Sequence, residues 1–465
     1  MKRARSAARV RLAAWSACVA APLLLGACDV KQELLAPQNP GVIDPSSVTT
    51  PAAADAVRVG AFSRFKAVTA GGESMWLYGG LLTDEWKSSD TFSQRNETDQ
   101  RSVQTGNANI ATAYAALQQT RGYIKSAIDL LHTYTPDSLR NIGQMYMVAG
   151  FTEMTLAENF CSGIPETFTV NGTVTYGPPL TSDSTYKRAS FFLDSALVTT
   201  TGTDAIATAN HQASLIARAR VLVDQGNFAA AAALVPVSAV PTTFQYLETF
   251  DLTTGSNQIT SLNNSAGRYT VSDSFDIGGI IQNALPFASA NDPRVPVLNT
   301  KKVGFDGTTT LIDQQIWPSA STLNDPVPLV SGVDARLIEA EARLNAGDFA
   351  GMMTILNALR TAGNITIGNY KVPAMLALAT LPATKSDAAK LFFREKGFWT
   401  FGRGQRLSDL RRMVRQYGFT QDQVFPTGSF AFKVSGAIYG TDVNFPVPDN
   451  ELTNPNFTAC IDRKA

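Results

Sequence analysis

Two stretches of the chain, ARVLVDQGNFA at residues 219–229 and AEARLNAGDFA at residues 340–350, share one pattern. In each, an apolar helical segment ends at a glycine, Gly226 or Gly347, and an Asn or Asp then begins the next helix. Glycine readily adopts the left-handed conformation that ends many helices, and Asn and Asp side chains cap helix N-termini. The pattern therefore predicts two tetratricopeptide-like helix pairs, which stack because a lone pair cannot bury its apolar face. An ordinary helical hairpin that arose twice is the alternative.

Apolar residues recur at three- and four-residue steps, the period of a helix, in several other segments. These segments are Asp55–Val68, Ala108–Leu131, Leu139–Asn159, Thr185–Leu197 and Ala209–Leu234. Gly, Asn, Ser, Thr, Asp and Pro dominate from about Pro236 to Gly332 and again over Phe425–Asn456, where we expect loops and a few short strands. The sequence thus predicts an all-α protein, a superhelical scaffold of tetratricopeptide-like helix pairs with an irregular, loop-rich ligand-binding face.

The N-terminus is typical of a lipoprotein signal peptide, residues 1–27. A basic stretch precedes an apolar run from Leu12 to Ala27, which is short for a membrane span. The tetrapeptide Leu25-Gly26-Ala27-Cys28 resembles the bacterial lipobox, in which the thiol of Cys28 accepts a diacylglycerol. Acyl chains on Cys28 would hold the protein at a lipid bilayer. An N-terminal transmembrane anchor is the alternative. Residues 28–54, rich in Pro, Gln and Asn, are interpreted as the lipidated cysteine and a tether.

The charge balance and the cysteines limit the partners and the cross-links. Five of the 39 basic residues lie in the signal, which leaves 34 basic against 39 acidic residues, a net charge of −5. A mildly acidic body argues against nucleic acid as a partner. Cys18 leaves with the signal, so Cys161 and Cys460 remain beside Cys28. They could form a disulfide, but sequence gives no distance, and we favour two buried free thiols.

Sequence motifs for catalysis or cofactor binding are missing. The chain has two histidines, His132 and His211, too few for a His-rich metal site. Gly402-Arg403-Gly404 begins like a dinucleotide fingerprint, but Leu407 occupies the place of its third glycine. We expect no cofactor, no metal and no enzymatic activity. A surface glycan hydrolase that uses a carboxylate pair is the alternative, because two acids can come from anywhere in the chain.

The C-terminal third resembles the SusD/RagB family of nutrient-uptake outer-membrane lipoproteins. The resemblance rests on motifs in a fixed order: RLIEAEARLNAGD at 336–348, LNALR at 356–360, REKGF at 394–398, GQRLSDLRR at 404–412 and FPVPDNELTNPN at 445–456. The family usually has an aromatic residue where this chain has Leu407-Ser408, which makes the chain a divergent member. We interpret the charged residues of these motifs as an ion-pair network that serves the fold: Arg394, Glu395, Arg406, Asp409 and Arg411.

The resemblance implies both an organisation and a function. The body, residues 55–465, would comprise an N-terminal helical part (55–235), a loop-rich insertion (236–332) and a C-terminal part (333–465). Such proteins bind an oligosaccharide or other nutrient at the outer membrane, facing outside, and deliver it as the lid of a SusC-like TonB-dependent transporter. Asp29 after the lipidated Cys28 would, in some bacteria, retain the protein on the inner membrane. A repeat-containing scaffold lipoprotein is a further alternative.

A sugar ring offers an apolar face to an aromatic side chain and hydroxyl edges to polar ones. Two polar stretches with tryptophans fit this requirement, Trp76–Phe92 and Gln314–Pro318. For any single tryptophan, burial in the core is the alternative. The candidate ligand-binding residues are Trp76, Tyr78, Asp84, Trp86, Asp90 and Trp317, with Tyr269 expected nearby.

Overall fold

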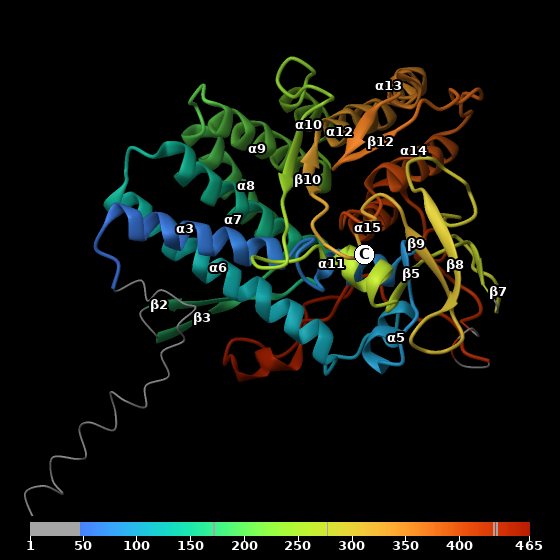
Figure 1. Ribbon diagram of the computed structural model, residues 1–465, viewed down its shortest axis with the longest axis horizontal. Helices are drawn as coiled ribbons and strands as arrows, with labels where there is room; N and C mark the ends of the chain where they lie inside the picture. Colours follow the sequence, from blue (N-terminus) through green and yellow to red (C-terminus); the bar gives the residue numbers. More distant parts are fainter. Residues whose placement is uncertain (1–46, 171–172, 277, 431–432, 434–435) are drawn as a thin grey trace, which may run out of the picture. The chain divides into compact units, whose positions relative to one another are not determined.

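The repeated helix pairs form where the sequence predicts them. In the computed structural model, which describes residues 47–465 except 171–172, 277, 431–432 and 434–435, α9 (Ala205–Asp224) is followed by α10 (Phe228–Leu234), and α12 (Gly332–Asn345) by α13 (Phe349–Ala362) (Figure 1). Gly226 and Gly347 lie between the paired helices with φ of 81° and 78°, the left-handed region that favours glycine. Because α10 packs against α12, the two pairs stack, and the prediction is confirmed.

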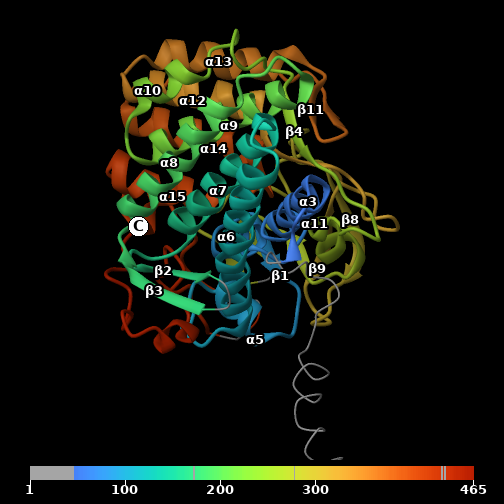
Figure 2. The same cartoon turned by 90° about the vertical axis from the view of Figure 1, so that its left-hand side faces the viewer.

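Long helices continue this stack toward the N-terminus. Consecutive helices pack on one another, α6 on α7, α7 on α8 and α8 on α9, while α3 lies against α6 (Figures 1 and 2). Side chains of Thr50, Asn107 and Thr181 cap three of these helices at their N-termini. The bounds of these helices are Pro51–Ala67 for α3, Ala108–Tyr134 for α6, Leu139–Asn159 for α7 and Ser182–Thr199 for α8. The predicted all-α fold is confirmed.

Short strands fill the loop-rich parts, and each strand of the described chain pairs with one antiparallel partner. The β1–β5 pair contacts β9 of the β8–β9 pair, beside the short helix α11 (Gln258–Thr260). The strands are β1 (Trp86–Ser88), β2 (Ile164–Val170), β3 (Thr173–Leu180), β4 (Gln245–Glu248), β5 (Tyr269–Val271), β6 (Phe275–Asp276), β7 (Gly279–Ile280), β8 (Val297–Val303), β9 (Thr310–Gln314), β10 (Val327–Ser331), β11 (Ile365–Ile367) and β12 (Tyr370–Val372).

One helix of the core had no helical signal in the sequence. Residues Met75–Leu82, predicted as part of a polar loop, form α4, and all of its residues are buried. The sequence MWLYGGLL is apolar on every side, so it lacks the amphipathic period of a surface helix. Helix α4 contacts α7 and α15 (Arg406–Tyr417), and α5 (Ser93–Asp99) follows it. The remaining C-terminal helix is α14 (Lys385–Thr400).

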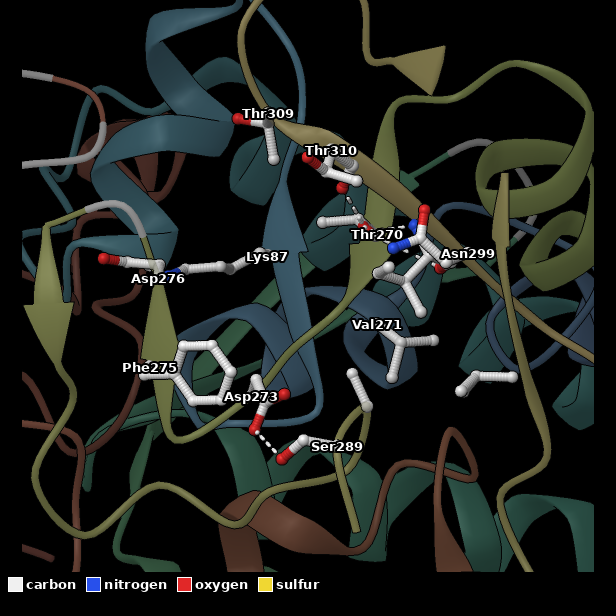
Figure 3. A pocket seen from close by; sticks show the side chains of 13 residues that line it. Lys87, Thr270, Val271, Asp273, Phe275, Asp276, Ser289, Asn299, Thr309 and Thr310 are labelled. Carbon is white, nitrogen blue, oxygen red and sulfur yellow. Dashed lines mark hydrogen bonds and ion pairs between the residues drawn. The ribbon is translucent and has the colours of Figure 1, made fainter. Parts of the chain in front are cut away.

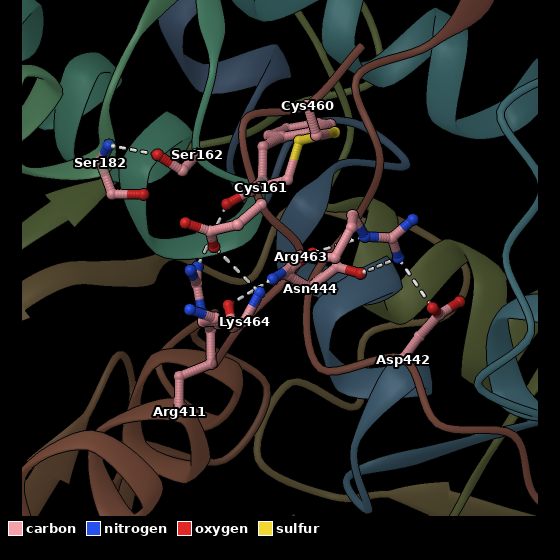
Figure 4. Close-up of a disulfide and its surroundings, with 11 residues drawn as sticks. Cys161, Ser162, Ser182, Arg411, Asp442, Asn444, Cys460, Arg463 and Lys464 are labelled. Carbon is pink, nitrogen blue, oxygen red and sulfur yellow. Dashed lines mark hydrogen bonds and ion pairs between the residues drawn. A yellow bond between two sulfur atoms is a disulfide. The ribbon is translucent and has the colours of Figure 1, made fainter.

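Cys161 and Cys460 form a disulfide (Figure 4), with a Cα–Cα distance of 6.0 Å. The expectation of two free thiols is wrong. The cysteines are 299 residues apart, and bridges between distant backbone segments, Phe160 with Phe445 and Ser162 with Asp462, bring them together. Such long-range pairing leaves no local signal in the sequence.

The predicted ion-pair network is confirmed for Arg394, Glu395, Arg406 and Asp409, whereas Arg411 bonds to backbone carbonyls instead of a carboxylate. Asp409 pairs with Lys396 at 2.6 Å and with Arg412 at 2.6 Å, while Glu395 pairs with Arg294 at 2.6 Å. Arg411 donates to the backbone carbonyls at the end of α7, those of Ala157, Glu158 and Phe160. These contacts join α14 and α15 to the rest of the core.

The remaining observations concern the extent of the folded body, the lipobox and membrane-spanning helices. Residues 49–465 form one compact unit. Cys28 and the lipobox lie outside the described residues. Among the helices of the described residues, none combines the length and the apolar character that crossing a membrane requires.

Candidate ligand-binding site

The seven side chains predicted to bind a ligand are buried, each with at most 2% of its surface exposed. They are Trp76, Tyr78, Asp84, Trp86, Asp90, Tyr269 and Trp317. The alternative considered for each tryptophan, burial in the core, is what the structure shows for Trp76, Trp86 and Trp317, because α4 and β1 are core elements. Ligand contact by any of the seven stays a prediction, and the structure gives each of them a packing partner instead.

Three of the tryptophans do come together, around the turn Gly402-Arg403-Gly404. Gly402 and Gly404 have φ of 70° and 67°. A Cβ at Gly404 would collide with the Trp76 ring, and a Cβ at Gly402 would lie 3.3 Å from Trp317 and 3.4 Å from Trp86. The glycines therefore admit the three indoles to the core, which explains the Gly-x-Gly motif without a nucleotide.

The two predicted acids hold the same region together. Asp84 accepts two hydrogen bonds from Arg406, at 2.7 and 2.8 Å. Asp90 pairs with Arg95 and, at 2.8 Å, with Arg268. Burial would raise the pKa of Asp90, but the hydrogen bond from Arg268 and the neighbouring positive charges outweigh it and lower the pKa. Tyr269 donates to Glu73 at 2.7 Å and lies edge-on to Trp86. These contacts stabilise the fold.

An open cavity of about 510 Å³ is lined by residues of β1, β5, β6, β8 and β9 and of the segments beside them (Figure 3). Lys87 and Thr270, cross-strand partners in the β1–β5 pair, both line it. Its other lining residues come from the end of β5, from the segment around β6, and from β8, β9 and the loops beside them. They are Val271, Asp273, Phe275, Asp276, Ala288, Ser289, Val297, Asn299, Thr309, Thr310 and Ile312. A volume of this size falls in the range of about 300–1,000 Å³ that small-molecule sites occupy.

The polar groups of the cavity are fixed by hydrogen bonds. Lys87 Nζ donates to Asp276 Oδ2, and Ser289 Oγ donates to Asp273 Oδ1 at 2.8 Å. Thr270 Oγ1 donates to the carbonyl of Thr310 at 3.1 Å. Polar side chains that are already fixed by hydrogen bonds need little reorganisation when a ligand binds. The cavity therefore presents oriented donors and acceptors.

Phe275 gives the cavity an aromatic surface. Its side chain is 55% exposed, so one ring face is available to a ligand. It lies on β6, and its cross-strand partner on β7 is Ile280. A flat ring beside oriented polar groups suits a molecule with an apolar face and hydroxyl edges, such as a sugar.

The candidates Trp86 and Tyr269 lie on the strands that border the cavity, but their neighbours in sequence line it. Successive side chains of a strand point to opposite faces. In β1, Trp86 packs on Phe401 in the core, and the next residue, Lys87, lines the cavity. In β5, Tyr269 is buried and Thr270 lines the cavity. Phe275, which also lines the cavity, was not among the sequence candidates, and its only sequence signal is that of a lone aromatic residue in a polar segment.

The described residues contain no group of His, Cys, Asp and Glu that could hold a metal ion. The lining of the cavity offers hydroxyl, amide, carboxylate and ammonium groups.

Comparison with solved structures identifies the fold. No sequence-family model matches the chain, and no curated protein matches it by sequence. A surface glycan-binding protein from Bacteroides uniformis superposes with a TM-score of 0.65 at 14% identity, covering 88% of this chain and 99% of that one. A SusD-like protein from Bacteroides fragilis gives 0.62 at 13% identity, covering 90% and 98%. A SusD/RagB family protein from Bacteroides thetaiotaomicron gives 0.60 at 14% identity, covering 88% and 95%. The chain therefore has the fold of SusD-like proteins.

Proposed function

We propose that this chain is a surface-displayed binding protein that captures a nutrient, an oligosaccharide, in the cavity beside Phe275. The observation that carries the proposal is the cavity itself, which combines an exposed ring with oriented polar groups on a loop-rich face. Its SusD-like fold supports the same function, because one protein of similar structure is a surface glycan-binding protein.

Binding of this kind needs no bond-breaking. Stacking of a base on an aromatic ring, the nearest measured analogue, contributes roughly 1–3 kcal/mol. That corresponds to about five- to 150-fold in dissociation constant. The hydroxyl edges of the sugar would meet Asp273, Asn299 and Thr309. Affinity would be modest, as suits a protein that must release its ligand to a transporter.

A glycan hydrolase is the second candidate, because two carboxylates, Asp273 and Asp276, line the cavity. We favour binding, since Asp276 is paired with Lys87, which leaves Asp273 as the one cavity carboxylate without an ion-pair partner among the described residues, whereas hydrolysis needs a pair of carboxyl groups. Turnover of a polysaccharide panel would distinguish the two functions.

We further propose that residues 1–27 are removed, that Cys28 is lipidated, and that the chain between Cys28 and α3 tethers the body to the outer face of the outer membrane. This tether would be shorter than the predicted one, residues 28–54, because Pro51–Ala54 belong to α3. A SusC-like TonB-dependent transporter would be the partner that receives the ligand, with this chain as its lid. Radiolabelled fatty acid should enter the wild-type protein and not Cys28→Ala. Proteolysis of intact cells should remove the body, and full protection would contradict external display.

The direct test is a glycan array probed with residues 28–465 carrying Cys28→Ser. We expect binding to one class of oligosaccharide without turnover. Cleavage of a bound glycan would favour the hydrolase. Absence of glycan binding, with a membrane partner still recovered by cross-linking, would favour a scaffold lipoprotein.

A further inference from the structure

The charges of the cavity limit which sugars it can accept, provided that it is the ligand site proposed above. Among the described residues that line it, the ionisable ones are one lysine and two aspartates, Lys87, Asp273 and Asp276, a net charge of −1. A partly enclosed site strengthens electrostatic interactions relative to water. The sign of this charge therefore matters for the ligand.

The lysine is not available to an anion. Lys87 Nζ is paired with Asp276, and the two side chains are only 6% and 12% exposed. Ser88, the residue after Lys87, donates its backbone N–H to the buried carboxyl of Asp99 at 2.7 Å, which ties β1 to α5. The other cations on the strands that line the cavity, Lys301 and Lys302 of β8, are exposed to solvent. Solvent and salt screen such exposed charges.

The second aspartate is open on one side. Asp273 Oδ1 accepts hydrogen bonds from Ser289 Oγ at 2.8 Å and from the Ser274 backbone at 2.7 Å. Its other oxygen, Oδ2, accepts no hydrogen bond from the part of the chain that the structure describes. This oxygen can accept from a hydroxyl or an amine of a ligand, and it repels a carboxylate or a sulfate.

We propose that the cavity selects neutral or amine-bearing saccharides and rejects acidic ones, such as uronic-acid or sulfated oligosaccharides. Asp276 neutralises Lys87, and Asp273 supplies the charge that discriminates. The selectivity arises from repulsion as much as from attraction, as in many specific sites.

The test compares three ligand classes on one protein. Residues 28–465 with Cys28→Ser are screened against neutral, glucosamine-containing and uronic-acid oligosaccharides, and hits are titrated by calorimetry. The wild type should bind neutral or amine-bearing glycans best. Asp276→Asn removes the carboxylate that pairs with Lys87, and Asp273→Asn removes the repelling charge. Each should raise the ratio of acidic to neutral affinity about tenfold or more.

Two further variants make the result decisive. Asp183→Asn on α8 is the matched control, since it removes the same charge from an exposed ion pair with Lys187, and the ratio should not change. Lys87→Met removes the cavity's cation and should lower the ratio of acidic to neutral affinity below that of the wild type. This variant provides the test if Asp276→Asn proves too unstable to assay. Preference of the wild type for acidic glycans, or an unmoved ratio, overturns the inference and leaves the binding function standing. Failure to bind any class overturns both.

Discussion

Arg406 binds Asp84 across 322 residues of sequence, with Nε on Oδ1 at 2.7 Å and Nη2 on Oδ2 at 2.8 Å. Both side chains are buried, so neither charge is solvated by water. The pair fastens the segment after α4 to the start of α15. Asp84 thus acts in the core, although its position among tryptophans and other acids predicts a ligand contact.

Asp84→Asn should destabilise the protein by about 3–5 kcal/mol, because it leaves Arg406 as an uncompensated buried charge. Urea unfolding monitored by circular dichroism measures the loss. Asp129→Asn breaks an exposed pair with Lys125 on α6 and should change stability little. Equal effects of the two variants would contradict the structural role of Asp84.

Gly404→Ala should unfold the protein far more readily than Gly418→Ala. Both glycines have positive φ, 67° and 75°, so an alanine at either position is strained by about 1–2 kcal/mol in the left-handed backbone conformation. At Gly418 a Cβ meets nothing within 4 Å, whereas at Gly404 it collides with Trp76. Thermal melts of both variants test this packing, and similar melting temperatures would show that the indole does not lie on Gly404.

The helical scaffold could be predicted from sequence because its signals are local. Gly226 and Gly347 mark helix ends by their backbone conformation, and Leu139–Asn159 matches α7 at both ends. Helix α4 could not be predicted, since a helix buried on all sides loses its amphipathic period. The Cys161–Cys460 disulfide depends on segments 299 residues apart.

The cavity was harder to predict than the scaffold. It is assembled from β1, β5, β6, β8 and β9, whose pairing no local pattern encodes. Tryptophans were predicted to bind the ligand because their rings can stack on sugars, yet such large apolar rings are also commonly buried in the core. Which role applies at Trp86 depends on which face of a three-residue strand it occupies.

The disulfide should stabilise the C-terminal segment against the helical scaffold. Cys161→Ala with Cys460→Ala should cost about 2–5 kcal/mol, because the cross-link closes a long loop of the unfolded chain. Reductant should lower the melting temperature of the wild type and leave that of the double variant unchanged. A wild-type melting temperature that does not respond to reductant under unfolding conditions would contradict the bond.

Stability should fall as pH rises from about 4.5 to about 8. Burial raises the pKa of Glu248 to about 8, far above its ordinary value of 4.5. The folded state therefore keeps a proton that the unfolded state releases, and stability drops by up to about 1.4 kcal/mol per pH unit in that window. The Thr69 hydroxyl donates to Glu248 Oε1 at 2.7 Å, which lowers the pKa, but burial outweighs this hydrogen bond.

Glu248→Gln removes the titrating proton and keeps the shape of the side chain, so it should flatten the pH profile. Glu85 and Asp99, whose pKa burial raises to about 8 and about 7, leave a remaining slope of the same sign. Urea unfolding at five pH values measures both profiles. Parallel profiles for wild type and variant would show that Glu248 is ionised in the folded protein.

Phe275→Ala and Trp86→Ala should separate the ligand site from the scaffold. Phe275 is 55% exposed, so its loss should weaken oligosaccharide binding about five- to 150-fold and leave the melting temperature nearly unchanged. Trp86 is buried against Phe401, so its loss should cost about 3–5 kcal/mol of stability. Phe191→Ala, at an exposed ring on α8, is the matched control and should change neither quantity. If instead Trp86→Ala weakens binding at an unchanged melting temperature while Phe275→Ala binds normally, the site lies at the tryptophan cluster and the cavity beside Phe275 is not where the sugar binds.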